Sequence, residues 1–172
     1  MRRLSVEPGR AGAYCEVMRA ALLPLLAATG LLAGCAPSAP AGVSKDKLDD
    51  AVGGAIGDPA TCVLIAERPS GKVVYQFNNH IVCGRLLPAC AGGAARQTVQ
   101  DLLKATVADD QPRMSSCTWP NDPSKGISWA SGPIPGKALT YAALMEGQRA
   151  LPGRMMAERL EDAFKSSGVE PR

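Results

Sequence analysis

An apolar run near the N-terminus decides how much of this chain is free to fold into a domain. The run extends from Ala20 to Ala33 and follows Arg19. It is 14 residues long, whereas a membrane-spanning helix needs roughly 20. A basic residue, a short apolar stretch and small residues at its exit are typical of a secretory signal. We therefore expect residues 1–34 to be a signal peptide and the domain to be built from the residues after it.

The run ends in Leu32-Ala33-Gly34-Cys35, which resembles the lipobox of bacterial lipoproteins. In that family the cysteine is lipidated and becomes the first mature residue, so the resemblance implies a lipid on Cys35. The plain alternative is an ordinary secretory signal with a cysteine beside it. Glu7 and Pro8 fit poorly in the basic start of a signal. Met18-Arg19 would open a compact signal by itself, and we expect Met18 to be the true start.

The residues after Cys35 predict how the domain is attached. Residues 36–43 are rich in Pro, Ala and Ser and cannot bury a core. We therefore interpret them as a short tether between the lipidated cysteine and the domain. The boundaries we expect are a lipidated cysteine with its flexible tether at 35–44 and one domain at 45–172. Ala36 is not aspartate, and the family's sorting pattern then implies the outer membrane, on the side that faces the periplasm.

Charge excludes one class of partner. Residues 1–34 hold four basic and two acidic side chains, so the remainder keeps 15 Lys and Arg against 14 Asp and Glu. A nearly neutral body without a basic stripe does not fit nucleic-acid binding. The membrane contact we expect therefore depends on the lipid.

Four cysteines lie in the body of the chain, at Cys62, Cys83, Cys90 and Cys117. In an exported protein such a set usually forms two disulfides. Three pairings are open. Cys83 and Cys90 are close enough to clip a local loop, and Cys62 with Cys117 would then close a long one. We expect no metal site, because no C-x-x-C pair occurs and His80 is the sole histidine.

The hydrophobic pattern predicts elements separated by turns. Ser44 can cap a helix that runs to Ile56, and Thr98 with Asp101 resembles a capping box that opens a second helix. An apolar run and an alternating run on either side of Pro69-Ser70-Gly71 predict a β-hairpin. The remaining expectations are loops at 78–93 and 108–124, strands at 127–130 and 139–146, a turn at 132–136, and a helix from Pro152-Gly153 to Gly168 with Glu161 on its outer face.

The order α-β-β-α-β-β-α with hairpins indicates the α+β class. We expect an antiparallel sheet of four to five strands, covered by helices and braced by disulfides. Aromatic residues make up only 4% of the chain, so the core must be mostly aliphatic.

The body resembles a shortened serine β-lactamase or penicillin-binding transpeptidase domain. The hairpin formed by residues 62–67 and 70–75 is similar to the one that opens such domains, and residues 127–132, 139–146 and 155–166 resemble their closing strands and helix. The resemblance covers about 70 residues. A profilin-like or roadblock-like domain, which binds partners, has a similar element order and stays open.

The chemistry of the β-lactamase family requires S-x-x-K, S-D-N and K-T-G motifs, and they are missing. Residues 88–94 hold no S-x-x-K where it should follow the hairpin, Ser115-Ser116-Cys117 is not S-D-N, and Ser124-Lys125-Gly126 lacks the threonine. No catalytic residue is therefore assigned, and no cofactor is implied.

Other polar candidates are better explained without chemistry. His80 has no nucleophile or carboxylate beside it in the sequence, and we interpret it as an ordinary loop residue. The acidic groups at 46–50 and 109–110 lack the spacing of a cation loop. Trp129 fits a core strand, whereas Trp119 lies in a predicted loop and could stack a sugar or a peptide.

These observations predict a lipid-anchored envelope protein whose domain binds or scaffolds. The expected partners are the membrane, through the lipid, and an envelope protein or peptidoglycan. The alternative is a serine hydrolase relative that has lost its activity.

Overall fold

The structure is a computed structural model that describes residues 38–92 and 94–171. Its main strands are β1 (Cys62–Glu67), β2 (Val73–Phe77), β5 (Arg113–Trp119), β6 (Asp122–Ile134) and β7 (Leu139–Gly147). Its helices are α1 (Lys45–Ile56), α2 (His80–Cys83), α3 (Val99–Asp109) and α4 (Gly153–Ser167). The short strands β3 (Leu87–Pro88) and β4 (Arg96–Gln97) form a separate two-stranded sheet.

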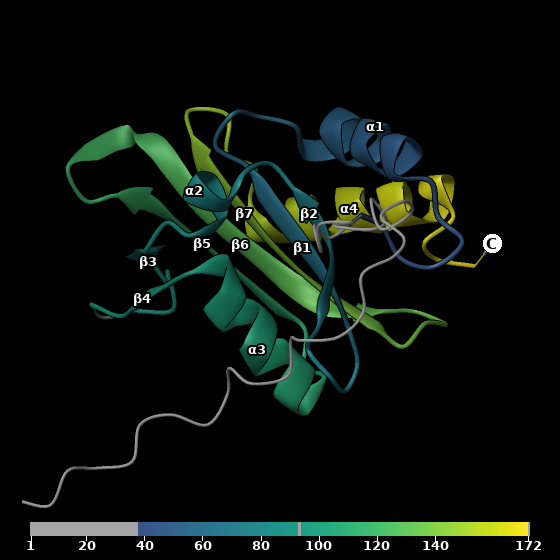
Figure 1. Ribbon diagram of the computed structural model, residues 1–172. Helices are drawn as coiled ribbons and strands as arrows, with labels where there is room; N and C mark the ends of the chain where they lie inside the picture. Colours follow the sequence, from purple (N-terminus) through teal and green to yellow (C-terminus); the bar gives the residue numbers. More distant parts are fainter. Residues whose placement is uncertain (1–37, 93, 172) are drawn as a thin grey trace, which may run out of the picture. The chain divides into compact units, whose positions relative to one another are not determined.

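The five main strands form one antiparallel sheet in the order β2-β1-β7-β6-β5 (Figure 1). The last strand, β7, is inserted between β1 and β6, so the two halves of the sequence share one sheet. The predicted α+β class, the antiparallel sheet and the disulfide bracing are confirmed. Strands β2 and β5 form its two edges.

The predicted helix starts are confirmed by their caps. The Ser44 hydroxyl accepts a hydrogen bond from the backbone N–H of Lys47 at the start of α1. Thr98 and Asp101 make a reciprocal capping box at the start of α3, which satisfies N–H groups that have no partner inside the helix. Gly168 ends α4 in the left-handed conformation, with φ of 86°.

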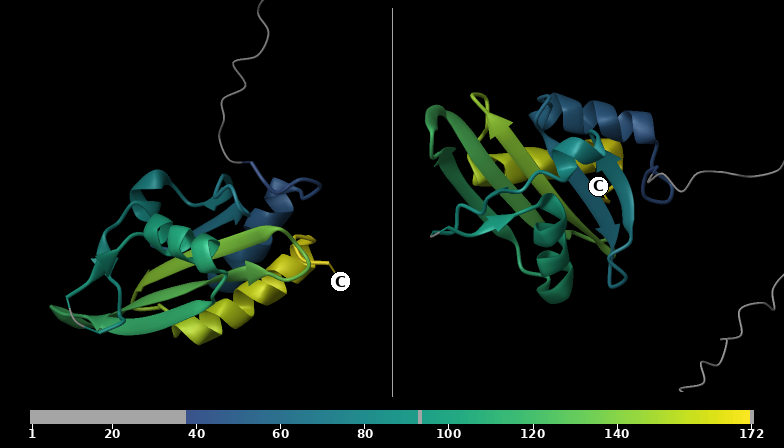
Figure 2. Two further views of the ribbon diagram at one scale, coloured as in Figure 1. Left: turned by 90° about the horizontal axis from the view of Figure 1, so that it is seen from below. Right: turned by 60° about the vertical axis from the view of Figure 1, so that its left-hand side comes forward.

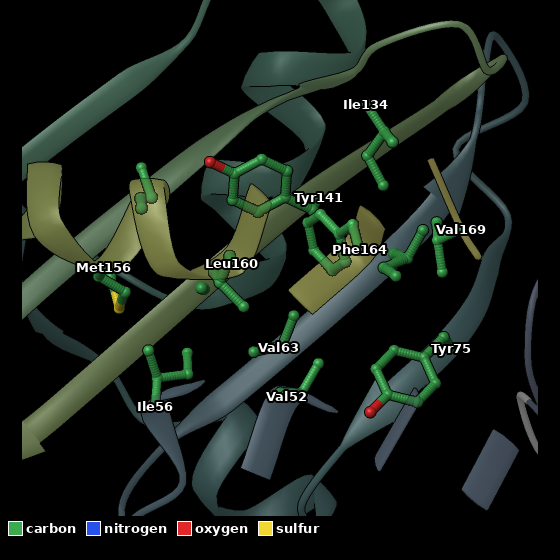
Figure 3. Close-up of a cluster of buried hydrophobic side chains, with 14 of the residues drawn as sticks. Val52, Ile56, Val63, Tyr75, Ile134, Tyr141, Met156, Leu160, Phe164 and Val169 are labelled. Atoms are coloured by element: carbon green, nitrogen blue, oxygen red, sulfur yellow. The ribbon is translucent and has the colours of Figure 1, made fainter. Parts of the chain in front are cut away.

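Helices cover both faces of the sheet (Figure 2). On one face, α1 and α4 bury a core around Leu48, Val52, Met156, Leu160 and Phe164 (Figure 3). On the other face, α3 buries Val99, Leu102 and Leu103 against a second cluster that includes Trp129. Trp129 is 1% exposed, as its place in a core strand predicted.

The prediction of a loop at 108–124 is wrong for the centre of this segment. Arg113–Trp119 form the edge strand β5, which pairs with β6 from Arg113↔Ser131 to Trp119↔Asp122. The prolines at 112 and 120 border the strand and do not interrupt it. The strand β6 also extends to Ile134, so the predicted turn at 132–136 begins later.

The disulfides join Cys62 to Cys83 and Cys90 to Cys117. The local Cys83–Cys90 clip is therefore wrong. The short helix α2, which lies within the expected loop 78–93, brings Cys83 to the start of β1. Cys117 belongs to β5, and this strand places it beside Cys90. Within the described residues, no helix is both long and apolar enough to cross a membrane.

Candidate functional site

A groove of about 550 Å³ lies between α4 and the β5 edge of the sheet. We call it the β5–α4 groove. It is lined on the sheet side by residues from the start of β5, the end of β6 and the middle of β7, among them Met114, Gly132 and Tyr141. On the helix side it is lined by Arg154, Ala157, Glu158 and Glu161.

The first residue of α4 is held directly against the edge strand. The backbone N–H of Gly153 donates a 2.7 Å hydrogen bond to the Ser116 hydroxyl. A Cβ at Gly153 would lie 2.5 Å from the Trp129 carbonyl oxygen and 2.8 Å from that of Ser115. Only glycine allows the helix to start this close to the sheet, and α4 then crosses the sheet and forms one wall of the groove.

Strand β5 divides its side chains between the two faces. Ser116 bonds the start of α4, whereas Cys117 is joined to Cys90 and packs with the cluster on the α3 face. Side chains alternate along a strand, so Met114 and Thr118 share the α4 face with Ser116. Met114 is 49% exposed and lines the groove.

Tyr141 supplies the unusual polar group of this groove. Tyr141 is only 4% exposed as a whole residue, and its hydroxyl makes no hydrogen bond with any residue that the structure describes. Its ring packs edge-on against Phe164, with 5.3 Å between the centroids, and its hydroxyl lies at the other end of the ring (Figure 3). The hydroxyl lies on the groove and is not among the described polar atoms that are buried without a partner, so it is open to a ligand in the groove.

The protonation of Tyr141 follows from its surroundings. Burial raises the pKa of Tyr141 above its ordinary value, and the nearby carboxylate of Glu161 raises it further. The phenol therefore stays protonated near neutral pH, where it can donate one hydrogen bond and accept others.

The helix wall carries an excess of negative charge. Arg154 and Glu158 form an ion pair at 3.1 Å one turn apart. Glu161 makes no ion pair within the part of the chain that the structure describes. The groove thus combines an apolar edge at Met114, the Tyr141 hydroxyl on its floor and, on its helix wall, the Glu161 carboxylate, which is unpaired among the described residues.

A second cavity of about 500 Å³ lies between α3 and the β1–β2 turn. It is lined mainly by apolar groups, including Val73, Leu103 and Val107, with Lys104 among the polar ones. None of the described polar atoms that are buried without a partner lines either cavity. The β5–α4 groove is the stronger candidate because it holds the Tyr141 hydroxyl and the Glu161 carboxylate side by side.

The residues singled out in the sequence lie elsewhere. Cys35 is outside the described residues. All four body cysteines belong to the α3 face and its loops, on the side of the sheet opposite α4. His80 is exposed at the start of α2.

Trp119 has structural partners on the α3 face. Its indole Nε1–H donates a 3.0 Å hydrogen bond to Glu146, which is itself mostly buried. Glu146 also forms an ion pair with Arg85 from the loop after α2. From the sequence, Trp119 was a candidate for stacking a sugar or a peptide. Its indole N–H is bonded within the domain and is therefore not free for a ligand.

The serine and acidic candidates also make structural contacts. The Ser124 hydroxyl bonds Asp122, which pairs with Lys125 at 2.9 Å. Asp109 and Asp110 pair with Arg113 and Arg68. No group of three or more His, Cys, Asp or Glu that could hold a metal ion occurs in the described ranges.

Sequence reasoning missed the residues of the groove. Tyr141 was predicted only as part of a buried strand, and Glu161 as an outer residue of the last helix. A phenol within an otherwise apolar strand, LTYAALM, was the available signal, because its hydroxyl needs a partner when it is buried. Compared with protein-family models, with curated proteins and with solved structures, the chain matches none of them.

Proposed function

We propose that this protein is a lipid-anchored component of the bacterial cell envelope whose domain is a non-catalytic binding module. Its ligand site is the β5–α4 groove. The observation that carries the proposal is the Tyr141 hydroxyl, which lies on the groove beside Glu161 and makes no hydrogen bond to another described residue. This hydroxyl is open to the groove, and a ligand with a complementary polar group can take the place of the solvent there and gain a hydrogen bond that is oriented by the buried ring.

The assignment of binding in place of catalysis rests on how the polar side chains are used. A nucleophile needs a base within hydrogen-bond reach. In the groove, no histidine or lysine of the described residues lies beside Tyr141, and the neighbouring carboxylate of Glu161 raises the pKa of the phenol and so keeps it protonated. The serines near the β5–β6 hairpin bond to Asp122 or to the backbone of Gly153.

The alternative function is a relative of the serine β-lactamases that has lost its chemistry. The position of β7 between β1 and β6 favours it, since the two strands that resemble the closing pair of such a domain lie beside the hairpin that resembles its opening one. Incubation of the protein with a penicillin, followed by intact-mass measurement, tests whether any of that chemistry remains. We expect an unchanged mass, whereas an adduct on a serine would replace the binding proposal with an enzymatic one.

The lipid anchor is tested by substitution of its cysteine. In a bacterium with two membranes fed an alkyne-tagged fatty acid, the wild-type protein should carry the label and sediment with the outer membrane. Cys35→Ala should remove both properties. Labelling that survives Cys35→Ala would contradict the lipobox assignment.

The ligand site is tested by a photo-crosslinking amino acid in intact cells. Benzoylphenylalanine at position 114 lies in the groove, and at position 81 it replaces Ile81, which is 70% exposed on α2. We expect a defined adduct from position 114 and none from position 81. No adduct at either position, or the same adducts at both, would remove the groove as the ligand site.

A further inference from the structure

Strand β5 is an open edge of the sheet. It is hydrogen-bonded to β6 on one side, and Arg113–Trp119 make no other backbone hydrogen bond to the residues that the structure describes. Natural proteins usually protect such edges with charged side chains, prolines or a covering element. From Met114 to Trp119 the strand carries neither a charge nor a proline, so its outer N–H and C=O groups can pair with another strand.

A strand added to this edge would bring its side chains to the groove. Successive side chains of a strand point to opposite faces of the sheet. Every second residue of an added strand would therefore lie on the α4 face, beside Met114 at the open end of the groove. Main-chain hydrogen bonds would provide affinity, and the groove would select the side chain, as in other cases of β-strand addition.

The charges of the groove select the kind of side chain. Arg154 is paired with Glu158 at 3.1 Å, which leaves the Glu161 carboxylate as the excess charge. The Tyr141 hydroxyl lies close enough to Glu161 to sense its charge, and it can accept a hydrogen bond. An ammonium or guanidinium group could pair with the Glu161 carboxylate and donate a hydrogen bond to the Tyr141 hydroxyl, whereas a carboxylate would be repelled by Glu161.

We propose that the ligand is an extended peptide segment of another protein, which pairs with β5 and inserts a lysine or arginine side chain into the β5–α4 groove. This assignment of the ligand rests on the proposed function. The cation pairs with Glu161 and donates a hydrogen bond to the Tyr141 hydroxyl. The aliphatic stem of the same side chain packs on Met114. A long basic side chain fits this combination, because its stem covers apolar surface while its charged end reaches a polar partner.

Synthetic peptides test the two parts of this inference separately. The probe is a capped heptapeptide of alternating threonine and valine with a central lysine. Two controls replace the lysine with norleucine or glutamate, and a third carries methyl groups on alternate backbone nitrogens, which removes the donors needed for pairing. Binding is followed by NMR of the isotope-labelled full chain, through the amides of β5 and the ring of Tyr141.

We expect the lysine peptide at millimolar concentration to shift the β5 amides and to slow their hydrogen exchange. The norleucine peptide should bind roughly fivefold more weakly, in keeping with a partly exposed charge pair, and the glutamate and N-methylated peptides more weakly still. Glu161→Gln should remove the preference for lysine. The matched control Asp162→Asn, which changes a neighbouring exposed carboxylate outside the groove, should keep it.

Each of the following outcomes would overturn the inference. Equal binding of the lysine, norleucine and glutamate peptides would remove the cation, and equal binding of the N-methylated peptide would remove strand pairing. A dimer that protects β5 without any peptide would assign the edge to a second copy of the chain. If no peptide perturbs the groove while crosslinking at position 114 succeeds, the inference fails and the proposed function stands. If both fail, the proposed function is lost as well.

Discussion

The backbone N–H of Gly153 donates a 2.7 Å hydrogen bond to the hydroxyl of Ser116, which joins the first residue of α4 to the edge strand β5. This contact fixes the two walls of the groove relative to each other. It depends on a glycine, since a side chain at position 153 would meet two backbone carbonyl oxygens.

Gly153→Ala should destabilise the domain by roughly 1–3 kcal/mol, because the new methyl group forces the helix away from β5 and β6. Urea unfolding measures the loss. The matched control is Gly54→Ala in α1, where no atom lies within 4 Å of the new Cβ. This control should be neutral or stabilising by up to about 1 kcal/mol. Equal effects of the two substitutions would contradict the close approach of α4.

Removal of either disulfide should cost about 3 kcal/mol in the chain-entropy description. The bonded cysteines are 21 and 27 positions apart, so the two losses should be similar. The paired substitutions are Cys62→Ala with Cys83→Ala, and Cys90→Ala with Cys117→Ala, each measured by urea unfolding. Peptide mapping without reduction is the control, and a fragment that links Cys83 to Cys90 would contradict the pairing.

Asp109 should titrate far below an ordinary aspartate. Its side-chain hydrogen bond with Arg113, helped by the backbone of Gln111, lowers the pKa of Asp109 from 3.8 to about 2. Since the folded pKa lies below the unfolded one, the contact stabilises the fold above pH 4, and this contribution is lost as the pH falls towards 2. NMR titration of the carboxyl carbon should show the low pKa in the wild type and a return towards 3.8 in Arg113→Gln.

Asp122 is the internal control for that titration. Hydrogen bonds from Ser124 and Lys125 lower the pKa of Asp122 independently of Arg113. Its titration should not change in Arg113→Gln. A parallel shift of both aspartates would indicate a general change of the fold and would contradict a local contact.

The pair formed by Arg85 and Glu146 should show strong energetic coupling. The Glu146 side chain is 9% exposed and that of Arg85 is 40% exposed. Arg85→Gln leaves a mostly buried carboxylate without its cation, so we expect a loss of about 1–3 kcal/mol. In a Glu146→Gln background the same substitution should cost less than about 0.5 kcal/mol. Tryptophan fluorescence is the readout, since Trp119 bonds the same carboxylate, and additive effects would contradict the coupling.

The elements with a strong pattern could be predicted from the sequence. The Thr98 cap, the hairpin around Gly71 and the last helix all combine local turn or cap chemistry with a clear hydrophobic period. Strand β5 has no such signal, because Ser115, Ser116 and Thr118 give it polar side chains on both faces. Only pairing with β6 defines it as a strand.

The groove and the pairing of the cysteines could not be predicted, and the reason is the same for both. Tyr141 and Glu161 lie in elements whose positions were expected, but the groove between them also needs β5 as its edge. Likewise, Cys117 reaches Cys90 only because β5 is part of the sheet. Partners that depend on an unrecognised edge strand cannot be found from local sequence.

Cys117 anchors strand β5 on the α3 face through its disulfide with Cys90, although the edge of the strand opposite β6 is open. The thiols of a newly made chain are reduced while it remains in the cytoplasm. If the protein is exported as we propose, the disulfide would fix β5, the proposed ligand edge, only after export. Formation of the disulfide would then come before binding of the partner at β5, and the chain would not bind this partner in the cytoplasm.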